Sequence, residues 1–202
     1  MKHKSLSLLL AVALLLTVSI GVSAEDSAPT APDNAATVSD SAPAAEEYGQ
    51  ANPAPVGIPQ TVRHSTSLAE YEATVTINSV LRGEAAWEKI HAANRFNAAP
   101  VGGMAGMEYI LAHITVDVHY SKNYLHNFFS EWSFTLFSTD DIEYKNFQAR
   151  PIIPGEVFRG DVFPGGTLSG YAVFLVSKTD PHPKVVIGGG YITRNGSWFS
   201  LG

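Results

Sequence analysis

The 202-residue sequence contains no cysteine. This absence excludes disulfide bonds, thiolate metal sites, a cysteine nucleophile and a lipid-modified cysteine. A domain without such cross-links obtains its stability from its apolar core alone.

Positive charge is also scarce. The chain has 13 lysines and arginines and 19 aspartates and glutamates, which gives a formal net charge of −6 at pH 7. Because nucleic acids and anionic lipids bind cationic surfaces, neither is an expected partner. The sequence also lacks a Gly-x-Ser-x-Gly nucleophile motif and a glycine-rich phosphate loop followed by a helix. These absences favour a protein that is not an enzyme and that needs no cofactor.

The N-terminal 24 residues have the features of an export signal. A basic start precedes the apolar run Leu8 to Val18, and small residues stand before Glu25. We therefore predict that residues 1–24 are a cleaved signal peptide; its removal takes two lysines and no acid, so the net charge changes from −6 to −8. The alternative is a retained membrane anchor, because Leu6 to Val22 is only just shorter than a membrane span.

Alanine, proline, serine and acidic residues dominate the next segment, residues 25–63. It has too few large apolar groups to offset the entropy lost on ordering its backbone, so we predict a disordered linker. The folded domain is predicted over residues 64–202. The expected location is secreted or at the cell surface, with no membrane contact after the signal is cleaved.

The segment Glu108 to Tyr120 has the clearest structural pattern. Apolar residues alternate with His113, Thr115, Asp117 and His119, which is the period-two pattern of a half-buried strand. At roughly 3.3 Å per residue the segment spans about 40 Å, so we expect a central strand with neighbours on both sides.

Similar reasoning applies to the rest of the domain. The predicted elements are strands at 71–81, 128–138, 142–147, 168–176 and 184–187, either a hairpin or a last strand at 191–201, and one helix at 84–94. The strand at 168–176 is apolar at nearly every position, as expected for burial on both sides. The predicted fold class is all-β: an immunoglobulin-like two-sheet antiparallel sandwich with one short helix after the first strand.

Four stretches carry a family resemblance: VLRGEAAWEKIHAANRFN, GMEYILAHITVDV, FPGGTLSGYAVFLV and WFSL. Through them, the chain from about Tyr71 to Leu201 resembles a family of secreted or surface-anchored bacterial domains of unknown function. That family is related to a small secreted mycobacterial antigen. The resemblance implies an immunoglobulin-like sandwich outside the membrane and supplies no catalytic residues. Many members follow a lipid-modified cysteine, which this chain lacks.

Several polar groups are candidate ligands or catalysts. His113, Asp117 and His119 share the polar face of the long predicted strand, where a metal site for calcium or zinc, or a hydrolase site, is the alternative to simple exposure. His113 lies roughly 13 Å from Asp117 along a strand, so a metal would need a ligand from a neighbouring strand. The acidic turn at 140–143 is a candidate calcium site, although it does not match the spacing of an EF-hand loop.

The predicted loop Ser121 to Asn127 is the other candidate site. Aromatic residues flank it, and Tyr124 and His126 are the side chains most suited to contact a ligand. The hypothesis from sequence is therefore an exported, non-catalytic binding module. Its contact residues are Tyr124 and His126 in this loop and the polar strand face around His113. The expected partner is an extracellular protein or a cell-wall glycan.

Overall fold

The strand β3 (Met107–Ser121) is the centre of the domain. It pairs antiparallel with β2 along one edge and with β7 along the other. Its inward side chains are each at most 1% exposed; they are Ile110, Ala112, Ile114, Val116 and Val118. The predicted alternation of apolar and polar faces is confirmed from Ile110 to Val118.

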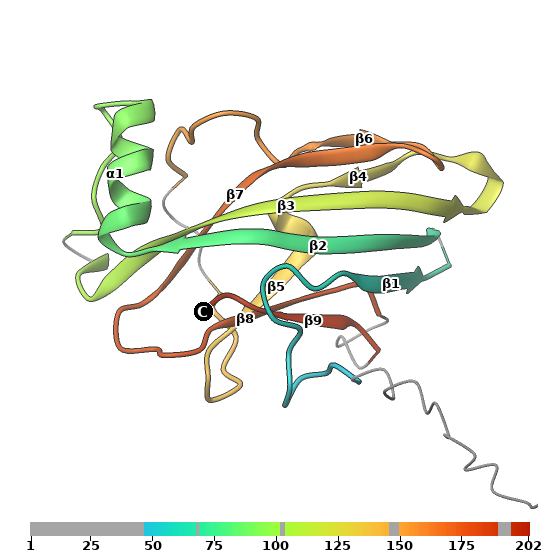
Figure 1. Cartoon of the computed structure of the whole chain (residues 1–202), viewed down its shortest axis with the longest axis horizontal. Coiled ribbons are helices and arrows are strands. Elements are labelled where there is room, and N and C mark those ends of the chain that lie inside the picture. Colours follow the sequence, from blue (N-terminus) through green and yellow to red (C-terminus); the bar gives the residue numbers. More distant parts are fainter. Residues whose placement is uncertain (1–46, 68, 102–103, 146–149, 190–194) are drawn as a thin grey trace, which may run out of the picture. The chain divides into compact units, whose positions relative to one another are not determined.

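The structure is a computed structural model that describes residues 47–67, 69–101, 104–145, 150–189 and 195–202 (Figure 1). Within these residues the elements, in chain order, are β1 (Gln60–Ser65), β2 (Glu70–Arg82), α1 (Glu84–Ala93), β3 (Met107–Ser121), η2 (Lys122–Tyr124), β4 (Asn127–Phe129), η3 (Glu131–Ser133), β5 (Phe134–Phe137), β6 (Gly160–Val162), β7 (Thr167–Ser177), β8 (Lys184–Ile187) and β9 (Ser197–Ser200). The predicted signal peptide and the predicted linker up to residue 46 lie outside the described residues.

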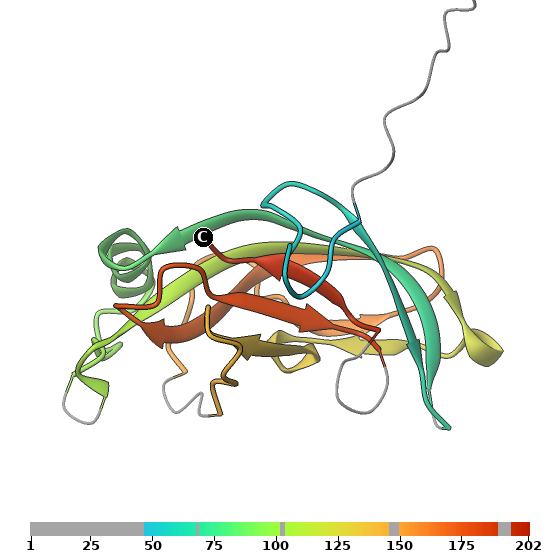
Figure 2. The ribbon, with the colours of Figure 1, turned by 90° about the horizontal axis from the view of Figure 1, so that it is seen from below.

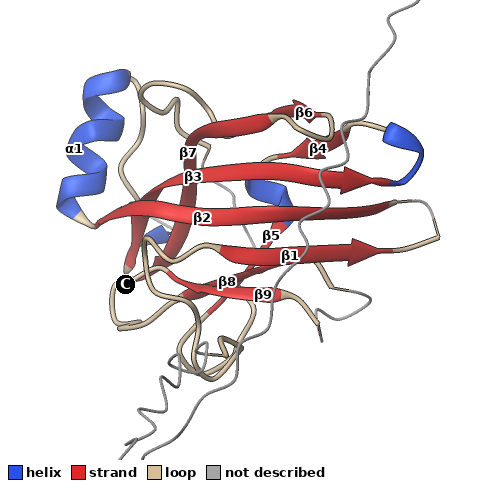
Figure 3. Ribbon diagram, turned by 45° about the vertical axis from the view of Figure 1, so that its right-hand side comes forward, coloured by secondary structure: helices blue, strands red, loops and turns tan. Residues whose placement is uncertain are grey.

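The strands form two layers. The larger sheet has the order β1-β2-β3-β7, and β5-β8-β9 form a second sheet, with β4 and β6 paired as a short ribbon. Figure 2 shows β2 and β3 arching over β8 and β9, and Figure 3 shows the strands in a single colour. The inner faces meet in one apolar core, to which Phe134, Phe174 and Phe199 contribute from the different sheets. The predicted all-β fold, with antiparallel sheets packed as a sandwich and one short helix, is confirmed. Strands β1, β2 and β3 are sequential neighbours in the larger sheet.

The helix α1 covers the opposite face of the large sheet at one end (Figure 1). Its buried residues Ala86 and Ile90 belong to a second apolar cluster with Tyr109, Leu111 and Leu175. A helix of this length is stable only when packed, so this cluster holds it in place. The helix follows the second strand rather than the first, because an additional strand precedes it.

That additional strand, β1, and the segment before it correct the predicted domain boundary at residue 64. Gln60 to Ser65 contains a single buried residue, Val62, so the sequence carried almost no period-two signal there. Further upstream Ala54 is fully buried and bridges to Phe199 of β9. Residues 54–63, predicted as linker, therefore belong to the folded domain.

The prediction of one continuous strand at 128–138 is also wrong, because the structure interrupts this strand at Ser130. The Ser130 hydroxyl accepts a hydrogen bond from the Trp132 backbone N–H (3.2 Å), and the Ser133 hydroxyl accepts one from the Ser130 N–H (3.1 Å). This capping box starts the turn η3 and sends β4 and β5 into different sheets. Trp132, which would lie on the same side of a continuous strand as Phe134, is instead in η3 and is 49% exposed. Of the predicted strand at 142–147, only a bridge from Glu143 to Phe137 lies in the described residues.

A β-bulge changes the direction of Tyr120. Glu72 of β2 pairs with Tyr120 and Ala73 pairs with Val118, so His119 is an extra residue on β3. The extra residue reverses the alternation, and Tyr120, expected to face the core, is 48% exposed.

A substitution at Gly170 tests the close contact between β7 and the segment around Val157 that covers its outer edge. A Cβ at this position would lie 2.6 Å from the Phe158 nitrogen and 2.6 Å from the Val157 carbonyl carbon, both of which are backbone atoms. We expect Gly170→Ala to lower the free energy of unfolding by about 1–3 kcal/mol, because the neighbouring backbone must move. Urea denaturation followed by tryptophan fluorescence measures this change. The control Ser169→Ala should cost less than about 1 kcal/mol, and equal stability of Gly170→Ala and the wild type would contradict the packing.

Candidate functional site

The three polar candidates on β3 do not converge on a common ligand. His113 Nδ1 lies 3.0 Å from the Asn78 side-chain nitrogen, and His119 Nε2 lies 2.7 Å from the Thr74 hydroxyl. The Thr167 hydroxyl donates to Asp117. Each candidate is thus bonded to a different residue of the neighbouring strands. Among the described residues, no group of three or more histidine and acidic side chains is arranged to hold a metal ion.

The pair formed by Thr74 and His119 has the separation of a nucleophile and a general base. A hydrolytic site also needs a third group that orients the base, and the nearby carboxylate of Asp117 is bonded to Thr167 instead. His119 is exposed on the sheet face. The arrangement is a set of cross-strand hydrogen bonds and does not assemble a catalytic constellation.

One carboxylate of the acidic turn at 140–143 is already paired with a cation. The Asp141 carboxylate lies 2.5 Å from Lys184 Nζ. Hydrogen bonds from Lys184 and Gln50 hold the pKa of Asp141 below its ordinary value. A lysine at this position supplies the charge that a cation would otherwise supply.

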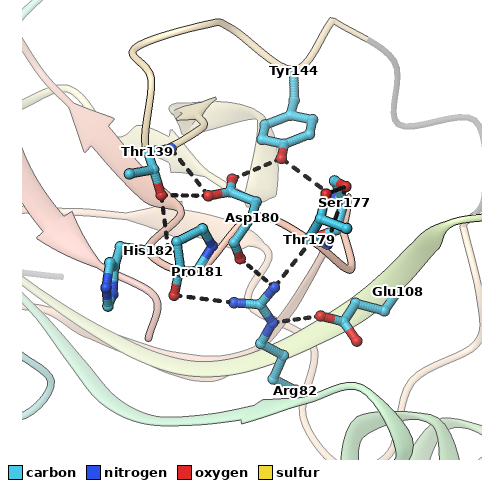
Figure 4. Close-up of polar contacts among 9 residues, drawn as sticks. All are labelled: Arg82, Glu108, Thr139, Tyr144, Ser177, Thr179, Asp180, Pro181 and His182. Carbon is cyan, nitrogen blue, oxygen red and sulfur yellow. Dashed lines mark hydrogen bonds and ion pairs between the residues drawn. The ribbon is translucent and has the colours of Figure 1, made fainter.

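The densest polar cluster joins the ends of both sheets (Figure 4). Arg82 lies 2.6 Å from Glu108 and donates hydrogen bonds to the carbonyl oxygens of Ser177 (3.2 Å) and Asp180 (2.5 Å). The Asp180 carboxylate, in a residue that is 7% exposed, accepts hydrogen bonds from Thr139 and, at 2.7 Å, from the Tyr144 hydroxyl.

The protonation states in this cluster are fixed at neutral pH. Burial raises the pKa of Asp180, but the hydrogen bonds from Thr139 and Tyr144 outweigh burial and hold the pKa below its ordinary value. Burial and the hydrogen bond to Asp180 raise the pKa of Tyr144 to about 12. Asp180 is therefore ionised and Tyr144 is protonated. Since its donors and acceptors are bonded within the cluster, we interpret it as a structural clamp.

The predicted contact loop lies at the other end of β3. Within the turn η2, Asn123 (φ 58°) and Tyr124 (φ 54°) both adopt the left-handed conformation, which is uncommon for tyrosine. Tyr124 is 80% exposed. His126 packs edge-on against the ring of Phe163 (5.6 Å between centroids), and its Nε2 lies 3.5 Å from Asp161.

Large apolar side chains gather around this loop. They are Tyr120, Tyr124, Leu125, Phe128 and Phe163, with exposed fractions of 48%, 80%, 56%, 56% and 58%; we call them the aromatic end. Pairing of β4 with β6 places Phe128 opposite Asp161, whose carboxylate faces His126. Of the aromatic residues that flank the loop in the sequence, Phe129 is buried and belongs to the core.

A groove of about 300 Å³ runs along the outer edge of β7. Its lining combines η3, the segment that begins at Arg150 and β7 itself: Glu131, Trp132, Arg150, Pro151, Ile152, Ile153, Val157, Arg159, Tyr171, Ala172 and Val173. The Arg150 guanidinium carbon lies 4.2 Å from the centroid of the Trp132 ring. Sequence reasoning missed this groove, because Trp132 was assigned to a continuous strand. The cap sequence Ser-Glu-Trp-Ser at 130–133 was the available signal.

A second hollow, of about 460 Å³, is lined by Thr61, Arg63, Ser65, Gly189 and Asn195. Among its described lining residues the charged side chain is Arg63, which lies 2.7 Å from Glu72. Its described lining residues include no aliphatic or aromatic side chain, and the Arg63 charge is already paired, so the groove beside β7 is the better ligand site.

The fold and these surfaces define a β-sandwich domain with one aromatic end and one lateral groove. No family model matches the chain, and no curated protein matches it. Among solved structures, a candidate lipoprotein of Bacillus subtilis is similar at a TM-score of 0.46 and 11% sequence identity. The similarity covers 70% of this chain and 37% of that protein. A likeness of this size identifies neither a family nor a function.

A helix that could span a membrane is not found in the described part of the chain, which begins at residue 47. The hydrophobic segment predicted as an export signal precedes that part.

Asp180 gives the clamp a measurable pH dependence. We expect Asp180→Asn to lower the free energy of unfolding at pH 7 by about 1–3 kcal/mol, because the variant loses charge-assisted hydrogen bonds. The folded pKa of Asp180 lies below the ordinary value of 3.8. The stabilisation is therefore complete above that pH and is lost as the pH falls through the folded pKa.

Urea titrations of wild type and variant between pH 7 and pH 2 measure this effect. The exposed Asp140→Asn variant is the matched control and should follow the wild type at every pH. A difference between Asp180→Asn and wild type that stays constant across this range would contradict the assignment.

Proposed function

We propose that this protein is an exported, non-catalytic binding module that contacts a partner protein through its aromatic end. The observation that supports this most strongly is the gathering of five large apolar side chains, each at least 48% exposed, around one turn of the domain. Soluble domains bury such groups where they can, and contiguous exposed apolar patches mark interaction surfaces. Tyrosine and phenylalanine are also enriched in the central part of protein interfaces.

The backbone of the loop adds a second argument. Tyr124 occupies a left-handed conformation that costs a bulky residue free energy, and it gains little burial in return at 80% exposure. Strain of this kind is concentrated at ligand-contacting positions. Such a turn presents the Tyr124 ring to a partner and reduces the entropy lost on binding.

The polar groups nearby favour a protein over a cell-wall glycan. Glycan recognition requires several free hydrogen-bonding groups beside an aromatic ring, whereas His126 and Asp161 face one another. Leu125 and the two phenylalanines of the aromatic end provide apolar area without polar groups. The acidic net charge of −6 disfavours nucleic acid as a partner.

Export is the second part of the proposal. The basic and apolar pattern of residues 1–24 supports it. The resemblance to secreted bacterial domains leads to the same expectation. A location outside the cell, released or at the surface, would make the aromatic end accessible to partners.

The role of the aromatic end can be tested by cross-linking in the cells that make the protein. A photo-reactive phenylalanine analogue is placed at position 124 or, as a control, at position 96 of the full chain. Phe96 is also 80% exposed but lies in the segment after α1. We expect one discrete cross-linked species from position 124 and none from position 96. Equal yields from both positions, or no adduct from position 124, would contradict the proposal.

The double variant Tyr124→Ala/His126→Ala separates binding from folding. Both side chains are exposed, so its melting temperature should stay within about 2 °C of wild type. With the photo-reactive group moved to position 128, the variant should form much less of the same adduct. A large fall in melting temperature would show instead that the loop is part of the core.

A further inference from the structure

Three segments that are distant in the sequence build the groove beside β7. Trp132 comes from η3, Ile152 and Val157 from the segment that follows Arg150, and Tyr171 from β7. The parallel bridge between Val157 and Tyr171 fixes the second of these segments against the strand edge. The groove therefore rests on the sandwich and is independent of the aromatic end.

The lining of the groove is suited to the apolar part of a small ligand. Most of its residues are aliphatic or aromatic, and Trp132, Ile152 and Val157 remain 49%, 61% and 46% exposed. A volume of about 300 Å³ holds about ten groups the size of a water molecule, since each takes about 30 Å³ in the liquid. These dimensions are at the small end of the range for ligand sites.

The groove is lined by one acidic and two basic side chains, Glu131, Arg150 and Arg159, so its described residues carry a net charge of +1. The Arg159 guanidinium lies 3.2 Å from the Glu131 carboxylate, so these two charges compensate one another. Arg150 has no acidic partner among the residues that the structure describes, and its guanidinium carbon lies over the Trp132 ring. The ring contact uses the charge without consuming the five N–H donors of the guanidinium, which can make a bidentate contact with a carboxylate.

We propose that this groove binds a small amphiphilic monoanion, with an aromatic or aliphatic body of about ten non-hydrogen atoms and one carboxylate. The apolar lining takes the body, and the carboxylate pairs with Arg150 at the groove mouth. A neutral ligand would leave the Arg150 charge unused, and a cationic ligand would be repelled by it. The site differs in place and ligand class from the protein contact proposed for the aromatic end, so either proposal can fail alone.

Matched probes test the charge requirement. Isothermal titration of the full chain compares 3-phenylpropionate with 3-phenylpropionamide and 3-phenylpropylamine, which share one apolar body and differ in charge. Octanoate tests whether an aliphatic body is also accepted. We expect 3-phenylpropionate to bind at least about tenfold more tightly than the amide, as a charge-assisted hydrogen bond predicts, and the amine not to bind measurably. Equal binding of the three phenyl probes, or no binding of either carboxylate at millimolar concentration, overturns the proposal.

Variants assign the effect to Arg150. Arg150→Gln should weaken carboxylate binding by about tenfold and leave amide binding unchanged. Arg95→Gln is the matched control, because Arg95 also lies over an aromatic ring, that of Phe96, at 4.9 Å, but is not among the groove residues. It should bind like the wild type.

Ile152→Asp provides a second variant that places a negative charge on the exposed lining and should abolish carboxylate binding. Melting temperatures establish that each variant is folded. Wild-type carboxylate affinity in folded Arg150→Gln or in folded Ile152→Asp overturns the assignment.

Discussion

The burial of one face of β3 is the constraint on which the rest of the structure depends. Its inner residues from Ile110 to Val118 are at most 1% exposed and pack in the apolar core between the two layers of strands. Because β3 also pairs with β2 and β7 along both edges, its position sets the register of the larger sheet. Fully burying each large aliphatic side chain contributes about 1.5–3 kcal/mol to the free energy of unfolding. Burial of this strand is therefore a large part of the stability of a domain that has no disulfide bonds.

Irregular segments cover parts of the sheet edges, and both surfaces that we propose for recognition lie in such connecting segments. Irregular segments bridge three outer strands: Val157 bridges to β7, Ala54 to β9 and Glu143 to β5. Such coverage reduces pairing between separate copies of the chain. The polar face of β3 is internally bonded across the strands. The side chains with unmet binding capacity lie instead in the loop after β3 and in the segments around the groove.

The sequence was informative where a single periodic pattern decided the structure. Glu108 to Tyr120 shows the alternation along most of its length, and its strand was predicted. Elements that depend on tertiary contacts were not predictable in this way. Strand β1 has only Val62 buried, and the capping box at Ser130 lies inside an apolar run that resembles one continuous strand. The sequence did not predict the groove for the same reason: Trp132 and Arg150 come into contact only when the chain is folded.

Native-state hydrogen exchange of the folded domain measures the central role of β3 directly. If β3 is the strand on which both layers depend, its amides exchange only through global unfolding. They should then be at least about 10³-fold more protected than the amides of the loop Ser121 to Asn127. Exchange of the β3 amides at rates close to those of that loop would contradict the structure proposed for the whole domain.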